Sequence, residues 1–163
     1  MSSIRNAFPG TKTIFLDSNI LVLLIVGQVR PNRLQEISPG NISFSIDDFE
    51  LIKEIILEYR ELRTTPYILS EVSSLLNKLD HNSRTECLEQ LSKYIPTLAN
   101  KYTPPQELAV DSRFSAFGIA DISILFASED SLVLTEDNPL IGLLQDSRTV
   151  VNYQTVKQLI TEQ

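Results

Sequence analysis

The chain has 163 residues, which is enough for one domain with a full hydrophobic core. Its 21 Asp and Glu residues outnumber 14 Lys and Arg, and the net charge of −7 excludes the overall basic character of a general nucleic-acid binder. A single cysteine excludes an intrachain disulfide, and the longest apolar run, residues 20–26, is too short to cross a membrane. We therefore expect a soluble, cytoplasmic protein.

The N-terminal part of the chain alternates polar and apolar segments. Residues 1–12 are mostly polar, which predicts a flexible tail before a single domain of residues 13–163. The apolar residues 13–16 predict a buried strand, and residues 19–27 predict a short helix. Two prolines and a glycine favour a long loop over residues 28–41.

Three helices are expected in the middle of the chain. Apolar residues at helical spacing predict them over residues 45–62, 64–79 and 82–98. Pro96 should kink or end the third helix. Each helix has its own N-terminal signal, namely a Ser45–Asp48 capping box, Thr65 before Pro66, and a Ser83–Glu86 capping box.

The C-terminal third continues the alternation of helices and strands. Residues 115–128 are apolar almost all round, which is typical of a buried helix. A strand over residues 131–135, a helix over 138–146 capped by Asn138, and a strand over 148–153 before a terminal helix complete the pattern. Strands separated by helices predict an α/β domain with a mainly parallel sheet.

Four acidic residues lie where a purely structural interpretation explains them poorly: Asp17, Glu71, Asp121 and Asp137. Asp17 directly follows the first predicted strand, and Asp137 follows a later one. Because ligands bind outside the carboxyl ends of parallel strands, these two acids are expected to converge. Asp121 lies in the middle of the buried helix among apolar neighbours, and Glu71 lies at the edge of the apolar stripe of its helix.

Four carboxylates at one edge of a sheet would repel each other and raise some of their pKa values. A divalent cation removes this repulsion. Oxygen ligands without His or Cys among them suit Mg²⁺ or Mn²⁺ better than zinc. Such ions activate water and stabilise the charge of a phosphoryl displacement.

Each acid also has a structural alternative. Asp17 could cap the helix that follows it, Asp137 could assist the N-terminus of the next helix, and Glu71 could be a boundary residue with its carboxylate in water. A buried ion pair with Arg113 or Arg148 would explain Asp121. The ordered set of four acids therefore carries more information than any one of them.

The same segments resemble PIN-domain nucleases, which include the toxin ribonucleases of bacterial and archaeal toxin–antitoxin pairs. The segments stand in the family's order and span residues 14–140. They are "IFLDSNIL" after the first strand, "ILSEVSSLL" with the helical Glu, "GIADISILFAS" with the Asp of the buried helix, and "LVLTEDNPL" with its Thr-x-Asp.

This resemblance implies a three-layer α/β/α PIN-like fold and metal-dependent hydrolysis of phosphodiester bonds, usually in single-stranded RNA. It implies that one or two Mg²⁺ or Mn²⁺ ions are held by Asp17, Glu71, Asp121 and Asp137. Asn19 and Thr135 would support these ligands through hydrogen bonds. The implied partners are an RNA substrate, an antitoxin protein that fills the active-site groove, and a second copy of the chain in a homodimer.

Two other functions remain open. A PIN-like fold can serve as a non-catalytic binding or scaffold module, although loss of a carboxylate would be its expected signature. A phosphatase could use Asp17 as the nucleophile of an aspartyl-phosphate intermediate. Such enzymes usually carry a second Asp two residues later, where this chain has Asn19. The choice between a toxin and a role in RNA processing or defence also stays open.

Overall fold

The most apolar segments of the chain form the centre of a parallel sheet. The computed structural model describes residues 10–161, and there the strands β1 (Thr13–Leu16) and β4 (Ser131–Thr135) are buried along their whole length. Such continuous apolar runs suit strands covered on both faces. The sheet has the order β3-β2-β1-β4-β5, and every neighbouring pair is parallel. The outer strands are β2 (Glu61–Thr64), β3 (Ala99–Asn100) and β5 (Thr149–Asn152).

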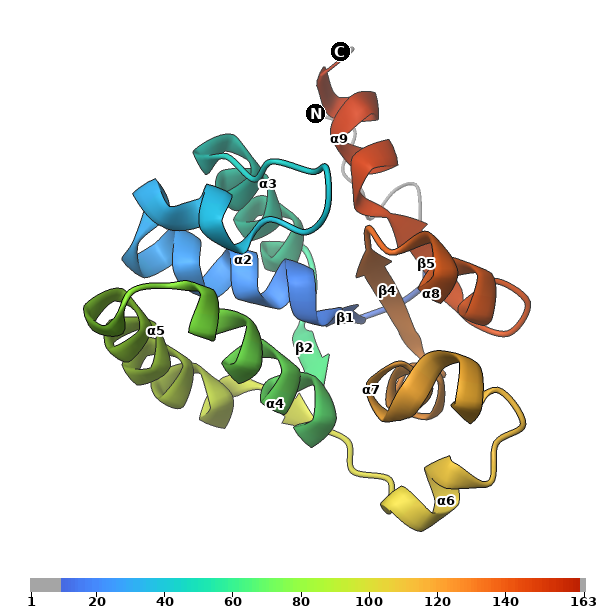
Figure 1. Ribbon diagram of the computed structural model, residues 1–163. Helices are drawn as coiled ribbons and strands as arrows, with labels where there is room; N and C mark the ends of the chain where they lie inside the picture. The colour runs from blue at the N-terminus through green and yellow to red at the C-terminus, as the bar shows by residue number, and fades with distance from the viewer. Residues whose placement is uncertain (1–9, 162–163) are drawn as a thin grey trace.

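Helices cover both faces of this sheet, which confirms the three-layer α/β/α architecture. The earlier helices lie together on the left of Figure 1, and α7 and α8 lie on the right. Crossovers between parallel strands are right-handed, so the chain changes face when it returns from β3 to β4. The earlier helices are α2 (Ser18–Val29), α3 (Ile46–Leu57), α4 (Pro66–Leu75) and α5 (His81–Tyr94). The later ones are α6 (Pro105–Ala109), α7 (Phe114–Ala127), α8 (Asn138–Leu144) and α9 (Tyr153–Thr161).

The apolar helix α2 is the centre of its layer. It is buried along most of its length and packs against α3, α4 and α5. Gly27 allows α3 to approach closely, since a Cβ there would lie 2.4 Å from the ring of Phe49. The unbroken apolar run that follows Asp17 is therefore explained by packing on all sides.

The strand order reverses at β1, which places a ligand-binding crevice at the carboxyl ends of β1 and β4. The register pairs Leu16 with Leu134, so these two strands end side by side. The backbone N–H of Asp17 donates to the carbonyl oxygen of Leu134 at 3.3 Å. The residues that follow the two strands must therefore meet at this edge.

The helix expected over residues 45–62 is too long by several residues. Helix α3 ends at Leu57, and residues 61–64 form β2 instead. Leu62, which continued the helical spacing, pairs with Ile14 in the sheet. A short strand beside β1 thus outweighs a local helical pattern.

Several other expected boundaries and caps are wrong. Helix α2 runs to Val29, and a 3-10 helix, Pro31–Ile37, replaces part of the expected loop. Further short 3-10 helices, Leu76–Lys78 and Ile95–Thr97, follow α4 and α5, and Pro96 ends α5 as expected. The sequence did not indicate β3 or α6. The real N-caps of α5 and α8 are Asp80 and Asp137, rather than Ser83 and Asn138, whereas the Ser45–Asp48 capping box and the Thr65 cap are confirmed.

The structure describes only three residues of the predicted N-terminal tail. Most of the predicted N-terminal tail, residues 1–9, lies outside the described residues, as do residues 162–163. Gly10, Thr11 and Lys12 precede β1 without helix or strand structure. Among residues 10–161, no helix is both long enough and apolar enough to cross a membrane.

Candidate active site

The four acids singled out in the sequence line one cavity of about 270 Å³. They come from four different elements. Asp17 follows β1, Glu71 lies on α4, Asp121 lies on α7, and Asp137 precedes α8. Asn19 lines the same cavity, but within the described chain its side chain is hydrogen-bonded to none of the four carboxylates. The fold therefore brings together residues that lie up to 120 positions apart (137 − 17 = 120).

Asp17 is buried, with only 4% of its surface exposed. Its Oδ1 accepts the backbone N–H of Ile20 at 2.9 Å, and its Oδ2 accepts the hydroxyl of Thr135. Burial raises the pKa of Asp17 to about 6 against the effect of these two hydrogen bonds, and the nearby charges of Asp137 and Glu71 raise it further. The helix-cap role is real, but it occupies one carboxylate oxygen inside an acidic cavity.

Thr135 connects the ends of the two central strands. Its buried hydroxyl donates to Asp17 and accepts the backbone N–H of Asp137 at 3.0 Å. Asp137 in turn caps α8, because its Oδ1 accepts the backbone N–H of Leu140 at 3.3 Å. The Thr-x-Asp sequence thus fixes two of the four carboxylates relative to each other.

Asp121 lies near a helix start, and not in the middle of a continuous helix as expected. Gly118 has φ 79° and ψ 178°, which breaks α7 and starts a new helical segment three residues before Asp121. A side chain at Gly118 would meet nothing within 4 Å, so glycine is required for its backbone conformation and not for space. The break places Asp121 in the first turn of the second helical segment.

The environment of Asp121 is acidic. Burial raises its pKa to about 7, and the charges of Asp137, Glu71 and Asp17 add to this effect. The expected alternative, an ion pair with an arginine, is absent among the described residues. Arg113 instead pairs with Asp111, and Arg148 donates to the backbone carbonyl oxygens of Leu125 and Ser147.

The position of Glu71 depends on contacts between α4 and α7 that the sequence did not indicate. The Thr65 hydroxyl caps α4 by accepting the backbone N–H of Ile68 at 3.2 Å. It also lies 2.8 Å from the hydroxyl of Ser123 on α7, and Ser123 donates to the carbonyl oxygen of Ala120 at 2.6 Å. A small polar residue within an apolar helix was the available signal for Ser123.

Glu136 is a second residue that sequence reasoning missed. It is buried between Thr135 and Asp137 in the chain, and its Oε1 has no hydrogen-bond partner among residues 10–161. The Nε2 of Gln154 donates to its other oxygen at 3.4 Å. Burial raises the pKa of Glu136 to about 7, and the charge of Asp17 adds to the shift. Glu136 therefore adds a further acidic group that interacts with Asp17 and Asp137.

Helix N-termini are the main positive groups near the cavity. Asp17, Asp137 and Asp121 each lie at the start of a helix or helical segment, where the backbone dipole favours negative charge. In the described part of the chain, no Lys or Arg side chain forms an ion pair with any of the four carboxylates. The helix dipoles leave most of the negative charge uncompensated.

The carboxylates match the ligand chemistry of Mg²⁺ or Mn²⁺, since all four offer hard oxygen donors. As they stand, however, no three His, Cys, Asp or Glu side chains within residues 10–161 are close enough together to hold a metal ion. The four carboxylates fit a divalent cation chemically, but in this arrangement their side chains are too far apart to coordinate one together.

The fold and the cavity together define an α/β protein with an acidic site at the switch point of an all-parallel sheet. No protein-family model matches the chain. No curated protein is significantly similar to it.

Proposed function

We propose that this protein is a metal-dependent ribonuclease of the PIN type that hydrolyses phosphodiester bonds in single-stranded RNA. One observation carries the proposal: Asp17, Glu71, Asp121 and Asp137 line a single cavity, and no Lys or Arg of residues 10–161 forms an ion pair with any of them. Burial and mutual repulsion raise the pKa values of Asp17 and Asp121, which is an unstable arrangement unless a cation is supplied from solution.

In this proposal the four carboxylates bind one or two Mg²⁺ or Mn²⁺ ions. When bound, such ions lower the pKa of water and stabilise negative charge on a phosphate. Thr135 holds Asp17 and the backbone of Asp137 in place, and Asn19 lines the cavity beside them. The N-termini of α2 and α8 add a positive potential that favours a phosphate group.

The phosphatase alternative is weakened by the environment of Asp17. Both of its oxygens already accept hydrogen bonds, and Asn19 occupies the position of the usual second acid. A non-catalytic binding module would keep the fold without cleaving nucleic acid. An antitoxin protein and a homodimer, which the family resemblance implies, belong to the same proposal.

The direct test is cleavage of labelled single-stranded RNA and DNA with added Mg²⁺ or Mn²⁺, comparing the wild type with Asp121→Asn. We expect cleavage of RNA that needs the metal and is lost in the variant. Metal binding without cleavage of either nucleic acid would favour the binding module. A phosphorylated Asp17 trapped with a phosphate ester would favour the phosphatase.

A further inference from the structure

Two tyrosines form a stacked pair beside the acidic cavity. Tyr67 lies in the first turn of α4, and Tyr102 follows β3. Their ring centroids are 6.4 Å apart and their planes differ by 18°. Tyr67 stands four residues before Glu71, and residues at this spacing are neighbours on one face of a helix. Ile68, next to Tyr67, lines the cavity itself. The tyrosine pair therefore lies at the edge of the site near Glu71.

The pair is fixed on one side and open on the other. The Tyr67 hydroxyl donates to the carbonyl oxygen of Thr103 at 2.7 Å, which ties the segment after β3 to α4. Tyr102 packs on Tyr67 but keeps 61% of its surface exposed. An aromatic ring that is held in place and still faces water offers a planar apolar surface to a ligand.

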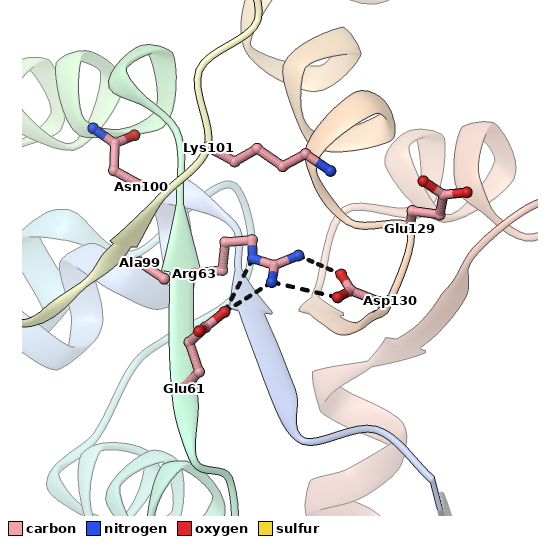
Figure 2. Close-up of a pocket in the computed structure, with 7 residues that line it drawn as sticks. All are labelled: Glu61, Arg63, Ala99, Asn100, Lys101, Glu129 and Asp130. Carbon is pink, nitrogen blue, oxygen red and sulfur yellow. Dashed lines mark hydrogen bonds and ion pairs between the residues drawn. The ribbon is translucent and has the colours of Figure 1, made fainter.

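A cationic side chain stands next to Tyr102 in the chain. Lys101 is exposed, and its ammonium group forms no ion pair or hydrogen bond in the described part of the molecule. Figure 2 shows the contrast with Arg63, whose guanidinium is bound by Glu61 and Asp130 while no dashed line reaches Lys101. Lys101 lines a pocket with Glu129 and Asp130, and its charge helps to lower the pKa of Asp130. In a chain of net charge −7, a lysine that forms no ion pair within residues 10–161 and stands beside an exposed ring still favours a ligand that combines phosphate with a flat apolar group.

We propose that Tyr102, supported by Tyr67, stacks on an unpaired nucleobase of the RNA substrate, and that Lys101 contacts the neighbouring phosphate. This inference rests on the proposed ribonuclease function. Stacking on an aromatic side chain requires a base that is not already stacked in a duplex. The tyrosine pair would thus select single-stranded RNA and place one nucleotide relative to the cavity.

The first test measures binding of a labelled single-stranded RNA in the non-cleaving Asp121→Asn background. We expect Tyr102→Ala to weaken binding by roughly 5- to 100-fold, the range for loss of one stacked base. Tyr102→Phe keeps the ring and should retain the affinity. Leu159→Ala is the matched control, since Leu159 is 59% exposed and lies on α9, at the far end of the molecule in Figure 1. Equal affinity of Tyr102→Ala and Tyr102→Phe would overturn the proposal.

A second test identifies the stacked base. Single bases are removed in turn from the RNA, and each substrate is measured with and without Tyr102→Ala. Stacking predicts one position at which base removal and the substitution do not add. Additive losses at every position would contradict it, because the substitution would then act without contacting a base.

Steady-state kinetics separate this inference from the ribonuclease proposal. In the otherwise wild-type enzyme, Tyr102→Ala should raise KM and leave kcat close to its original value. Cleavage by the wild type with an unchanged KM in Tyr102→Ala would overturn the stacking role alone. If the wild type neither binds nor cleaves RNA, the proposed function fails and the stacking role fails with it.

Discussion

Two aspartates in this protein have little solvent exposure but opposite electrostatic environments. Asp17 at the cavity is 4% exposed, and Asp48 at the start of α3 is 1% exposed. Burial disfavours the charge on both. At Asp48, however, Lys157 donates from 2.7 Å and Tyr153 from 2.7 Å, and with Ser45 they outweigh burial, so that the pKa is lowered. Asp17 accepts hydrogen bonds from a hydroxyl and a backbone N–H but pairs with no cation in the described part of the chain, and its pKa is raised to about 6.

The comparison separates structural acids from functional ones. Asp48 carries its own cation within the fold and links α3 to α9. Asp130 is similar, because Arg63 lowers its pKa (Figure 2). Among residues 10–161 the carboxylates of the cavity have no such partner, so the fold keeps them at a cost in free energy. A cation from solution that binds at the cavity would remove this cost.

The largest expected difference between the two sites is in activity. Asp17→Asn should reduce metal-dependent RNA cleavage by at least about 100-fold, since it removes a ligand charge that the reaction requires. Asp48→Asn should keep wild-type cleavage at a temperature where it is folded. Initial rates on the same labelled RNA measure both, and comparable losses in the two variants would remove the distinction between the sites.

The substitutions Asp17→Asn and Asp48→Asn should change the stability of the fold in opposite directions. At about pH 7 without metal, Asp17→Asn should raise the free energy of unfolding by up to about 3 kcal/mol, because a pKa raised from 3.8 to about 6 means that the ionised carboxylate is destabilising. Asp48→Asn should lower it by about 1–3 kcal/mol, because it removes a buried carboxylate that accepts charge-assisted hydrogen bonds from the partly exposed Lys157 and from Tyr153. Urea unfolding measures both values. Destabilisation by Asp17→Asn would show that its carboxylate is already compensated.

The effects of Asp17→Asn and Asp48→Asn on stability should also depend differently on pH. A raised folded-state pKa makes the native state bind a proton more tightly than the unfolded chain, so the ionised Asp17 destabilises the fold above about pH 6 and has no effect below about pH 4. The stabilising effect of Asp17→Asn should therefore disappear as the pH falls from about 7 to 4. Asp48 has a lowered pKa, so its contribution should persist to about pH 4 and be lost only below it.

Unfolding curves over this pH range, recorded for the wild type and both variants, measure these effects. Parallel pH profiles for Asp17→Asn and Asp48→Asn would mean that the two carboxylates titrate alike.

Loss of the Thr135 hydroxyl should reduce cleavage less than loss of the Asp17 charge. Thr135→Val keeps the shape but removes the hydroxyl that bridges Asp17 and the backbone of Asp137. We expect about 1–3 kcal/mol of destabilisation from the unpaired groups, together with about tenfold weaker cleavage. Thr135→Ser restores the hydroxyl and should recover most of both. Equal behaviour of the Val and Ser variants would exclude the bridging role.

The sequence allowed the parallel sheet and the convergence of the four acids to be predicted for one shared reason. Asp17 and Asp137 follow strands of clear apolar character, and the carboxyl ends of such strands lie at one edge. The position of Asp121 was only partly predictable. Its apolar neighbours marked a buried helix, but the backbone break at Gly118 is a conformational property that helical periodicity does not reveal.

Contacts between distant segments explain what was missed. Residues 61 and 62 continue a helical pattern but belong to β2, because pairing with β1 outweighs local preference. The link between Thr65 and Ser123 and the stack of Tyr102 on Tyr67 join residues 58 and 35 positions apart (123 − 65 = 58; 102 − 67 = 35). Neither residue of either pair carries a local signal that identifies the other.

The central claim is that the cavity carboxylates need a cation from solution. The most direct measurement is the thermal unfolding of the wild type, Asp17→Asn and Asp48→Asn at about pH 7 with increasing Mn²⁺. We predict that the unfolding temperature of the wild type and of Asp48→Asn rises with the metal concentration, and that of Asp17→Asn does not. An unfolding temperature of the wild type that is independent of Mn²⁺, or an equal rise in Asp17→Asn, would contradict the claim.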